Sequence, residues 1–276
     1  MPFLTNTTSD QSVDIYYQDY GSGKPVILIH GWPLSHRAWE GQVSRLVDNG
    51  YRVISYDRRG FGVSSSPWDG YDYTSLASDL REIILHLDLD HCTIVGFSMG
   101  GGEVVRYFTE YGNDRIAKAG LVSSIIPLVA QKDDNPDGVP QDALNDIMAA
   151  LKNDRVGFLK GFHQNFYNYD DNKDKISEAQ LEYDWVIASH ASPRATIKCA
   201  ESWATTDFRS ELKNVNVPTL IVHGDADNIV PKATSADQAA EGIPNNTYKV
   251  IEGGPHGLNA THTEQLNDIL LDFLKS

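Results

Sequence analysis

The feature that most constrains the fold is a serine between glycines, placed where a strand is expected to pass into a helix. The segment Gly96-Phe97-Ser98-Met99-Gly100 follows a short apolar, β-favouring stretch at 92–95. After it, apolar side chains recur at helical spacing at Val104, Val105, Phe108 and Tyr111. This pattern predicts a tight turn that holds the Ser98 hydroxyl clear of a sheet, with a helix N-terminus behind it. The alternative is that Ser98 only caps a helix.

Apolar runs and helical patterns alternate along much of the rest of the chain. Continuous apolar runs such as Pro25–Ile29 are expected of strands buried on both faces of a sheet. Strands are predicted at 13–20, 25–29, 52–56, 92–95, 117–123, 219–222 and 247–251. Because helical patterns separate most of these strands, the sequence predicts an α/β fold with a doubly wound, mostly parallel sheet.

Helix starts are predicted where a capping side chain precedes an apolar periodic stretch. Thr74 or Ser75 is expected to cap the helix that carries Leu76 and Leu80. Thr261, with Glu264 three residues later, has the capping-box spacing expected at the start of the final helix.

The alternation is interrupted between about residues 127 and 208. This stretch has no convincing strand pattern, and helical patterns occur at 142–152, 155–167, 177–190 and 194–204. We therefore predict a core made of 1–126 and 209–276, with 127–208 inserted between strands as a helical cap. The alternative is a plain helical extension that packs on the edge of the sheet.

Three predicted strands end in side chains that together could activate a serine. Ser98 follows one strand, Asp225 and Asp227 follow a later one, and His256 follows the last. In doubly wound sheets, sites form outside the carboxyl ends of the strands. A histidine can take the serine proton and return it to the leaving group, while a carboxylate orients the imidazole. We favour Asp227, partly from the family pattern given below, and expect Asp225 to hold its loop through backbone hydrogen bonds.

Backbone N–H groups are expected to stabilise the negative charge that develops when the serine attacks. One candidate is the N–H of Met99, directly after the serine. The other is the N–H of Trp32 in the loop after the strand at 25–29, because Pro33 has no N–H to donate. The histidines at two other strand ends, His30 and His223, are interpreted as structural.

Composition and charge exclude several classes of function. The formal net charge of -15 argues against nucleic-acid binding, because phosphate backbones need a basic surface. No apolar run approaches the length of a membrane span, and Met1–Asn6 lacks the features of a signal peptide. The two cysteines, Cys92 and Cys199, lie too far apart in sequence to suggest a disulfide scaffold. We therefore expect a cytoplasmic protein.

Several segments jointly resemble the cofactor-free bacterial haloperoxidases, including the bromoperoxidases and chloroperoxidases, and the related aryl esterases. The resemblance runs nearly end to end and is carried by His30-Gly31-Trp32-Pro33, 57–62, 96–103, 223–231 and 253–257. It implies an α/β-hydrolase fold, with an eight-stranded, mostly parallel sheet and a helical cap.

The resemblance also implies an assignment of the site. Ser98, Asp227 and His256 match the catalytic triad of the family, and Trp32 and Met99 match its oxyanion donors. The family hydrolyses small esters through an acyl-enzyme, without metal or haem. Hydrogen peroxide can replace water as the attacking molecule, and the resulting peracid oxidises bromide or chloride.

Further expectations and alternatives follow from the same residues. In the family, a proline after the oxyanion tryptophan often accompanies perhydrolase activity, and Pro33 holds that position. The implied partners are a small ester or carboxylic acid and hydrogen peroxide, with no nucleic acid or membrane; a homo-oligomer is left open. A lactonase, a carbon–carbon bond hydrolase or a ligand-binding receptor could carry the same triad. Dehalogenases and epoxide hydrolases are disfavoured, because they carry an aspartate where Ser98 stands.

Overall fold

An eight-stranded sheet runs through the part of the chain that the computed structural model describes, residues 2–7 and 12–276. Residues 1 and 8–11 of the predicted core segment 1–126 lie outside the described residues. The strands are β1 Phe3–Asn6, β2 Val13–Tyr20, β3 Pro25–Ile29, β4 Arg52–Tyr56, β5 Cys92–Phe97, β6 Ile116–Val122, β7 Thr219–Gly224 and β8 Asn246–Ile251.

The order of the strands across the sheet is β1-β2-β4-β3-β5-β6-β7-β8. The pairs β1–β2 and β2–β4 are antiparallel, and every other neighbouring pair is parallel. The predicted doubly wound, mostly parallel sheet is therefore confirmed. The short edge strand β1 is not among the strands that the sequence pattern predicts individually.

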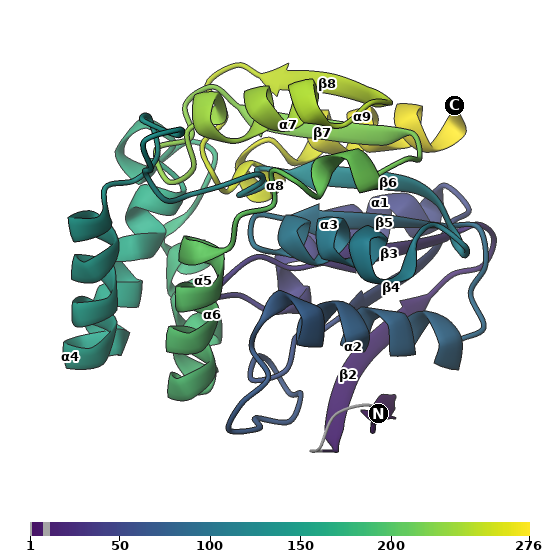
Figure 1. The fold of residues 1–276 in the computed structure, drawn as a ribbon, viewed down its shortest axis with the longest axis horizontal. Helices are drawn as coiled ribbons and strands as arrows, with labels where there is room; N and C mark the ends of the chain where they lie inside the picture. Colours follow the sequence, from purple (N-terminus) through teal and green to yellow (C-terminus); the bar gives the residue numbers. More distant parts are fainter. Residues whose placement is uncertain (1, 8–11) are drawn as a thin grey trace.

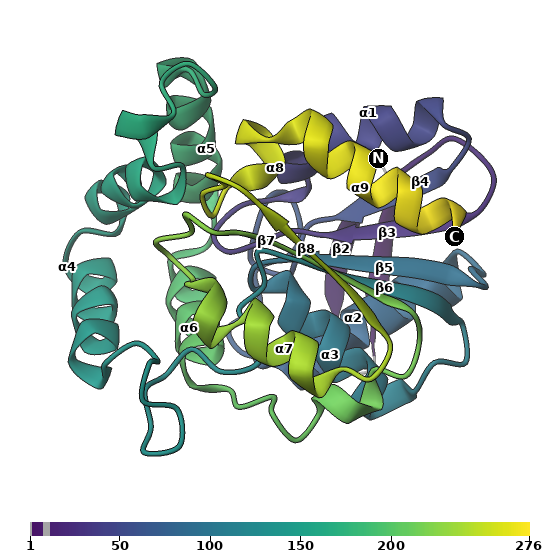
Figure 2. The ribbon, with the colours of Figure 1, turned by 90° about the horizontal axis from the view of Figure 1, so that it is seen from above.

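Helices cover both faces of this sheet. They are α1 Glu40–Asp48, α2 Tyr73–His86, α3 Gly100–Tyr111, α4 Gln141–Phe166, α5 Glu178–His190, α6 Pro193–Thr205, α7 Ala236–Gly242, α8 Leu258–Thr261 and α9 Thr263–Lys275. Short 3₁₀ helices occur at His36–Trp39, Tyr169–Asp171, Leu212–Asn214 and Lys232–Thr234. Figure 2 shows α1, α8 and α9 on one side of the sheet and α2, α3 and α7 on the other.

Alternation along the strands divides the core between these two sides. In β3, Ile27 and Ile29 belong to the buried cluster that contains residues of α2, α3 and α7. Val26 and Leu28 belong to the cluster that contains residues of α1, α8 and α9. A central strand thus buries both of its faces, which explains why Pro25–Ile29 is continuously apolar.

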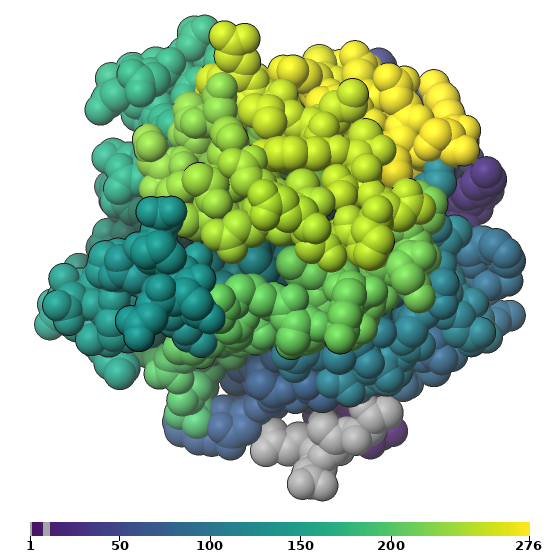
Figure 3. Space-filling view, turned by 45° about the horizontal axis from the view of Figure 1, so that its top comes forward, coloured from purple at the N-terminus to yellow at the C-terminus, as the bar shows by residue number. Residues whose placement is uncertain are grey.

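The segment between β6 and β7 contributes helices α4, α5 and α6 and no strand of the main sheet. Among described residues 127–208, β-type pairing is limited to two isolated bridges. Helix α4 has non-helical backbone at Asp154, which separates the two helices predicted there. Figure 1 shows these three helices beyond one end of the sheet, and Figure 3 shows the teal surface of this segment on the left, beside the yellow-green part of the chain that precedes the yellow C-terminal segment.

Two predicted helix caps are wrong. Asp72 caps α2, because its Oδ1 accepts a hydrogen bond of 3.0 Å from the backbone N–H of Ser75. Thr261 does not form a capping box, because the chain is already helical at α8 and His262 occupies the position before α9. Helix α2 therefore begins before the predicted caps, at Tyr73, whereas α9 begins at Thr263, after the position that a cap at Thr261 would give it.

Two further findings concern the expectations about membranes and disulfides. In the described ranges, no helix is both long and apolar enough to cross a membrane. Cys92 and Cys199 are both buried and free, and burial raises the pKa of each thiol to about 12.

Candidate active site

Ser98 lies at the apex of the turn between β5 and α3. Its φ of 52° is in the left-handed region, which is rarely adopted by residues other than glycine. The flanking glycines make this turn possible. A Cβ on Gly96 would lie 2.3 Å from the carbonyl oxygen of Gly100, and a Cβ on Gly100 would lie 2.6 Å from the oxygen of Ile29. The Ser98 N–H donates to the oxygen of Val122 on β6, which ties the turn to the neighbouring strand.

His256 connects Ser98 to Asp227. The His256 Nε2 lies 2.9 Å from the Ser98 Oγ, and its Nδ1 lies 2.7 Å from Oδ2 of Asp227. The three residues come from the loops after β5, β7 and β8, and each is at most 5% exposed. Because the described chain brings the three side chains together in a hydrogen-bonded series, Ser98 has a base within reach of its proton.

The Asp227 carboxylate accepts from several donors. Its Oδ1 accepts from the N–H groups of Ile229, at 2.9 Å, and Val230, at 2.7 Å. Its Oδ2 faces His256 Nδ1 and also His223 Nε2, 3.1 Å away. Burial by itself would raise the pKa of Asp227, but the charge of a protonated His256 and the hydrogen bonds from both histidines outweigh it and hold the pKa well below the ordinary range.

Close contact between two loops brings Asp227 to His256. A Cβ on Gly224 would lie 1.9 Å from the oxygen of Gly254, so only glycine permits this approach. The same oxygen of Gly254 accepts a hydrogen bond of 3.1 Å from the Ala226 N–H. Asp225 is exposed and accepts from the N–H of Gly253 at 2.7 Å. Asp225 therefore contacts the loop and not the imidazole.

The candidate oxyanion donors Trp32 and Met99 lie beside the same serine. Among the turn and loop hydrogen bonds of the described residues, none is donated by the backbone N–H of Trp32 or Met99. Both N–H groups are therefore available to an oxyanion. The Trp32 side chain is anchored in the helical insertion, because its Nε1 donates to the oxygen of Thr196 at 2.9 Å. Its ring also packs edge-on against Phe162 and tilted against Trp203.

A cavity of about 710 Å³ opens onto these residues. Most of its wall is apolar, and helix α4 supplies much of it. Within the described chain, His256 is the only lining residue with an ordinary titratable side chain. The wall consists of Trp32, Ser98, Met99, Ile125, Val129, Val139, Leu144, Ile147, Gly157, Phe158, Gly161, Phe162, Gln164, Asn165, Trp203, Asn228, Ile229, Val230 and His256. An uncharged organic molecule fits this wall best, since burial of an unpaired charge is costly.

Comparisons with known proteins agree with this geometry. The model of the alpha/beta hydrolase fold family matches residues 24–263. The chain is 39% identical to the non-heme chloroperoxidase CPO-A1 of Kitasatospora aureofaciens, over 97% of this chain and 98% of the relative. It is 36% identical to the bifunctional esterase/perhydrolase DCH of Acinetobacter calcoaceticus, over 98% and 99%. The crystal structure of bromoperoxidase from Bacillus anthracis matches with a TM-score of 0.95 and 47% identity, covering 100% of both chains. The chain belongs to the α/β-hydrolase family, in the group of the non-heme haloperoxidases.

The C-terminal end of α4 contacts the loop that carries His256 in this α/β-hydrolase. The carbonyl oxygen of Phe166 accepts from the Gly257 N–H at 2.9 Å, and the Phe166 ring lies edge-on to His256 with centroids 4.9 Å apart. The ring of Tyr167 leaves no room for a side chain at Gly257, where a Cβ would approach it to 2.3 Å. The helical insertion therefore contacts the imidazole as well as the cavity.

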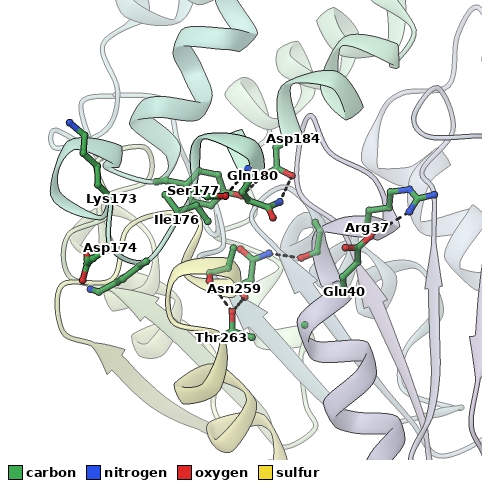
Figure 4. Close-up of a pocket in the computed structure, with 15 residues that line it drawn as sticks. Arg37, Glu40, Lys173, Asp174, Ile176, Ser177, Gln180, Asp184, Asn259 and Thr263 are labelled. Atoms are coloured by element: carbon green, nitrogen blue, oxygen red, sulfur yellow. Dashed lines mark hydrogen bonds and ion pairs between the residues drawn. The ribbon is translucent and has the colours of Figure 1, made fainter. Parts of the chain in front are cut away.

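A second cavity, of about 520 Å³, lies where the insertion meets α1, α8 and α9. Figure 4 shows Gln180 and Asp184 directed toward one another on its wall, with Arg37 and Glu40 paired on another side. Asp184 accepts from the hydroxyl of Tyr167, and burial raises the pKa of this carboxyl to about 6. Asp184 thus links the second cavity to the residues that hold the His256 loop.

One residue of the site, His223, makes a contact that the sequence does not predict. His223 was expected to be only structural, yet its Nε2 lies 3.1 Å from Oδ2 of Asp227. The signal that could have pointed to it is its spacing. His223 follows the apolar run of a buried strand and stands four residues before Asp227, with Gly224 between them at the end of the strand. In the described chain, no group of three or more His, Cys, Asp or Glu side chains is arranged to hold a metal ion.

The glycines of the turn provide a test of the elbow geometry. Gly100→Ala is expected to lower the free energy of unfolding by about 1–3 kcal/mol, because its Cβ would collide with backbone that cannot move aside. Gly161→Ala in α4 is the matched control, since its Cβ meets nothing within 4 Å. There we expect a gain of up to about 1 kcal/mol from helix propensity. Urea unfolding of both variants checks this, and equal effects would contradict the steric argument.

Proposed function

We propose that this chain is a serine hydrolase in which Ser98 is the nucleophile, His256 the general base and Asp227 the residue that orients the imidazole. One observation carries the proposal. The buried hydrogen-bonded series from Asp227 through His256 reaches the Oγ of Ser98 at the wall of an apolar cavity. The strain of the turn exposes the hydroxyl to that cavity, and the helix N-terminus behind it favours negative charge.

In the proposed mechanism, His256 takes the proton of Ser98 as the Oγ attacks the carbonyl carbon of an ester. The N–H groups of Trp32 and Met99 stabilise the oxyanion. His256 then protonates the leaving alcohol, and an acyl group remains on Ser98. Water, activated by the same histidine, hydrolyses this acyl-enzyme to a carboxylic acid and free serine.

Hydrogen peroxide is proposed as a second acceptor of the acyl group. Its oxygen attacks the acyl carbon while His256 takes the proton of that oxygen; the bond to the Ser98 Oγ then breaks, His256 returns the proton to Ser98, and a peracid leaves. In solution the peracid transfers an oxygen atom to bromide or chloride, giving hypohalous acid and the carboxylate. Two kinds of relative support this route, the non-heme chloroperoxidase and the bifunctional esterase/perhydrolase. We accordingly propose that the substrates of this enzyme are a small ester or carboxylic acid and hydrogen peroxide.

The helical insertion is proposed to act as a cap, with 127–208 as the cap and 1–126 and 209–276 as the core. Supporting this division, α4 supplies much of the cavity wall and Trp32 hydrogen-bonds to α6. We further propose that the enzyme works in the cytoplasm, where its two buried, free cysteines would stay reduced, and that its net charge of -15 keeps it from nucleic acids.

Titration with phenylmethylsulfonyl fluoride tests the proposed function. We expect loss of p-nitrophenyl acetate hydrolysis in proportion to sulfonylation, with the adduct on the peptide that contains Ser98. Peroxide-dependent bromination of a phenolic dye in acetate buffer, without added metal, should fall in parallel. A buffer without a carboxylic acid is the control, because no peracid can form there. Bromination that survives full sulfonylation would contradict the acyl-enzyme route.

A further inference from the structure

We propose that His223 is a positioning residue for Asp227, holding its carboxylate in the orientation that His256 requires; this inference rests on the proposed function. His223 lies at the end of β7 and is fully buried. Its Nε2 is 2.8 Å from the carbonyl oxygen of Val230 and 3.1 Å from Oδ2 of Asp227. One ring nitrogen therefore faces both the carboxylate and the backbone of the loop that carries it.

The hydrogen-bond partners of His223 determine which ring nitrogen carries the proton. A carbonyl oxygen can only accept, so the short contact with Val230 places a hydrogen on Nε2. The other ring nitrogen, Nδ1, is buried and has no hydrogen-bond partner among the described residues. A proton on Nδ1 would be a buried, unpaired donor, which costs free energy. The geometry thus favours neutral His223 with hydrogen on Nε2.

These contacts form a closed ring around the Asp227 side chain. The N–H of Val230 donates to Oδ1 of Asp227 at 2.7 Å, while the oxygen of Val230 accepts from His223. His223 Nε2 then lies against the second carboxylate oxygen, Oδ2. Rotation of the carboxylate would break contacts on both of its oxygens. The ring consequently fixes the direction in which Oδ2 meets the Nδ1 of His256.

His223 also shares Oδ2 with His256. The positive end of its N–H dipole lies near the carboxylate oxygen and offsets part of the negative charge that stabilises a protonated His256. Without His223, the protonated imidazole is favoured and a higher pH is needed to obtain the neutral base. Another charged group that interacts with His223 is Asp237 on α7. Asp237 is paired with Lys232 at 2.8 Å and accepts from the Tyr248 hydroxyl at 2.7 Å.

Two variants separate positioning from simple packing. His223→Leu has similar bulk but no donor, whereas His223→Gln can place an amide N–H near the position of Nε2. For His223→Leu we expect kcat/KM for p-nitrophenyl acetate to fall about tenfold, with the acidic limb of its pH profile moved to higher pH. We expect His223→Gln to recover most of both effects. Titration of the reactive serine with phenylmethylsulfonyl fluoride measures the fraction of enzyme that is folded, and each rate is divided by this fraction.

A measurement on the unaltered enzyme keeps the inference testable if His223→Leu does not fold. Two-bond ¹H–¹⁵N imidazole spectra should show His223 neutral with hydrogen on Nε2 across the pH range of activity. Hydrogen on Nδ1 would overturn the proposal, as would a His223→Leu enzyme that loses only thermal stability and keeps the wild-type pH profile. Either result would leave the proposed function unaffected. The proposed function itself fails if the wild-type enzyme does not hydrolyse esters.

Discussion

Ser98→Ala is expected to lower kcat for p-nitrophenyl acetate by roughly 10⁶-fold, the loss typical of removing the nucleophile from a triad. Peroxide-dependent bromination in acetate buffer should disappear with it, because the peracid forms only by attack on the acyl group. The physical reason is that no other described hydroxyl lies within hydrogen-bonding distance of His256 Nε2. Stopped-flow and steady-state assays of the purified variant measure both activities.

A matched control for this prediction is Ser55→Ala. Ser55 is also a buried serine, within strand β4, but its Oγ has no hydrogen-bond partner among the described residues. We expect this variant to keep wild-type turnover in both assays. If Ser98→Ala retained hydrolysis at the Ser55→Ala rate, the assignment of the nucleophile would be wrong. Retained bromination alone would show that halide oxidation does not require the acyl-enzyme.

Asp227→Asn is expected to reduce kcat by about 10⁴-fold at neutral pH, as found when the carboxylate of a triad becomes an amide. An amide in this position cannot stabilise the protonated imidazole. Its nitrogen can also donate to Nδ1 of His256 and thereby select the tautomer that cannot accept the serine proton. The variant keeps nearly the same volume, so the packing around the buried side chain is preserved. Steady-state kinetics with an ester substrate measure the effect.

Asp225→Asn is the control for this prediction, because the two aspartates lie two residues apart in one loop. Asp225 is exposed and its side chain contacts only the N–H of Gly253 among the hydrogen bonds of the described residues. We expect a loss of no more than roughly threefold, since the amide oxygen can still accept that bond. A larger loss for Asp225→Asn than for Asp227→Asn would reverse the roles proposed for the two residues.

Much of the fold could be predicted because the relevant signals are local. Continuous apolar runs mark the central strands, and their burial on both faces is the reason for that pattern. The boundaries of α2 and α9 were predicted less well. At α2 the capping side chain is that of Asp72 and not of Thr74 or Ser75, and α9 follows the short helix α8 with no side-chain cap at His262. The edge strand β1 was missed because four residues at a sheet margin carry little periodicity.

The candidate site could be predicted in outline for a topological reason. Parallel strands present their carboxyl ends at one edge of the sheet, so residues after three such strands were expected to meet there. Choosing between Asp225 and Asp227 depended partly on resemblance, because both follow the same strand. The distance of 2.7 Å from Asp227 to His256 exists because Gly224 and Gly254 allow two loops to touch.

Sequence alone thus led to the strand, turn and helix around Ser98 and to the order of serine, aspartate and histidine along the chain. These features depend on residue type and spacing over short ranges, where steric limits on the backbone act directly. The partners of Asp227, the anchoring of Trp32 in α6 and the contact of Phe166 with His256 depended on the folded molecule. Some of these contacts join segments that are far apart in sequence, and others depend on the conformation of a loop. Such contacts form only when the whole chain packs.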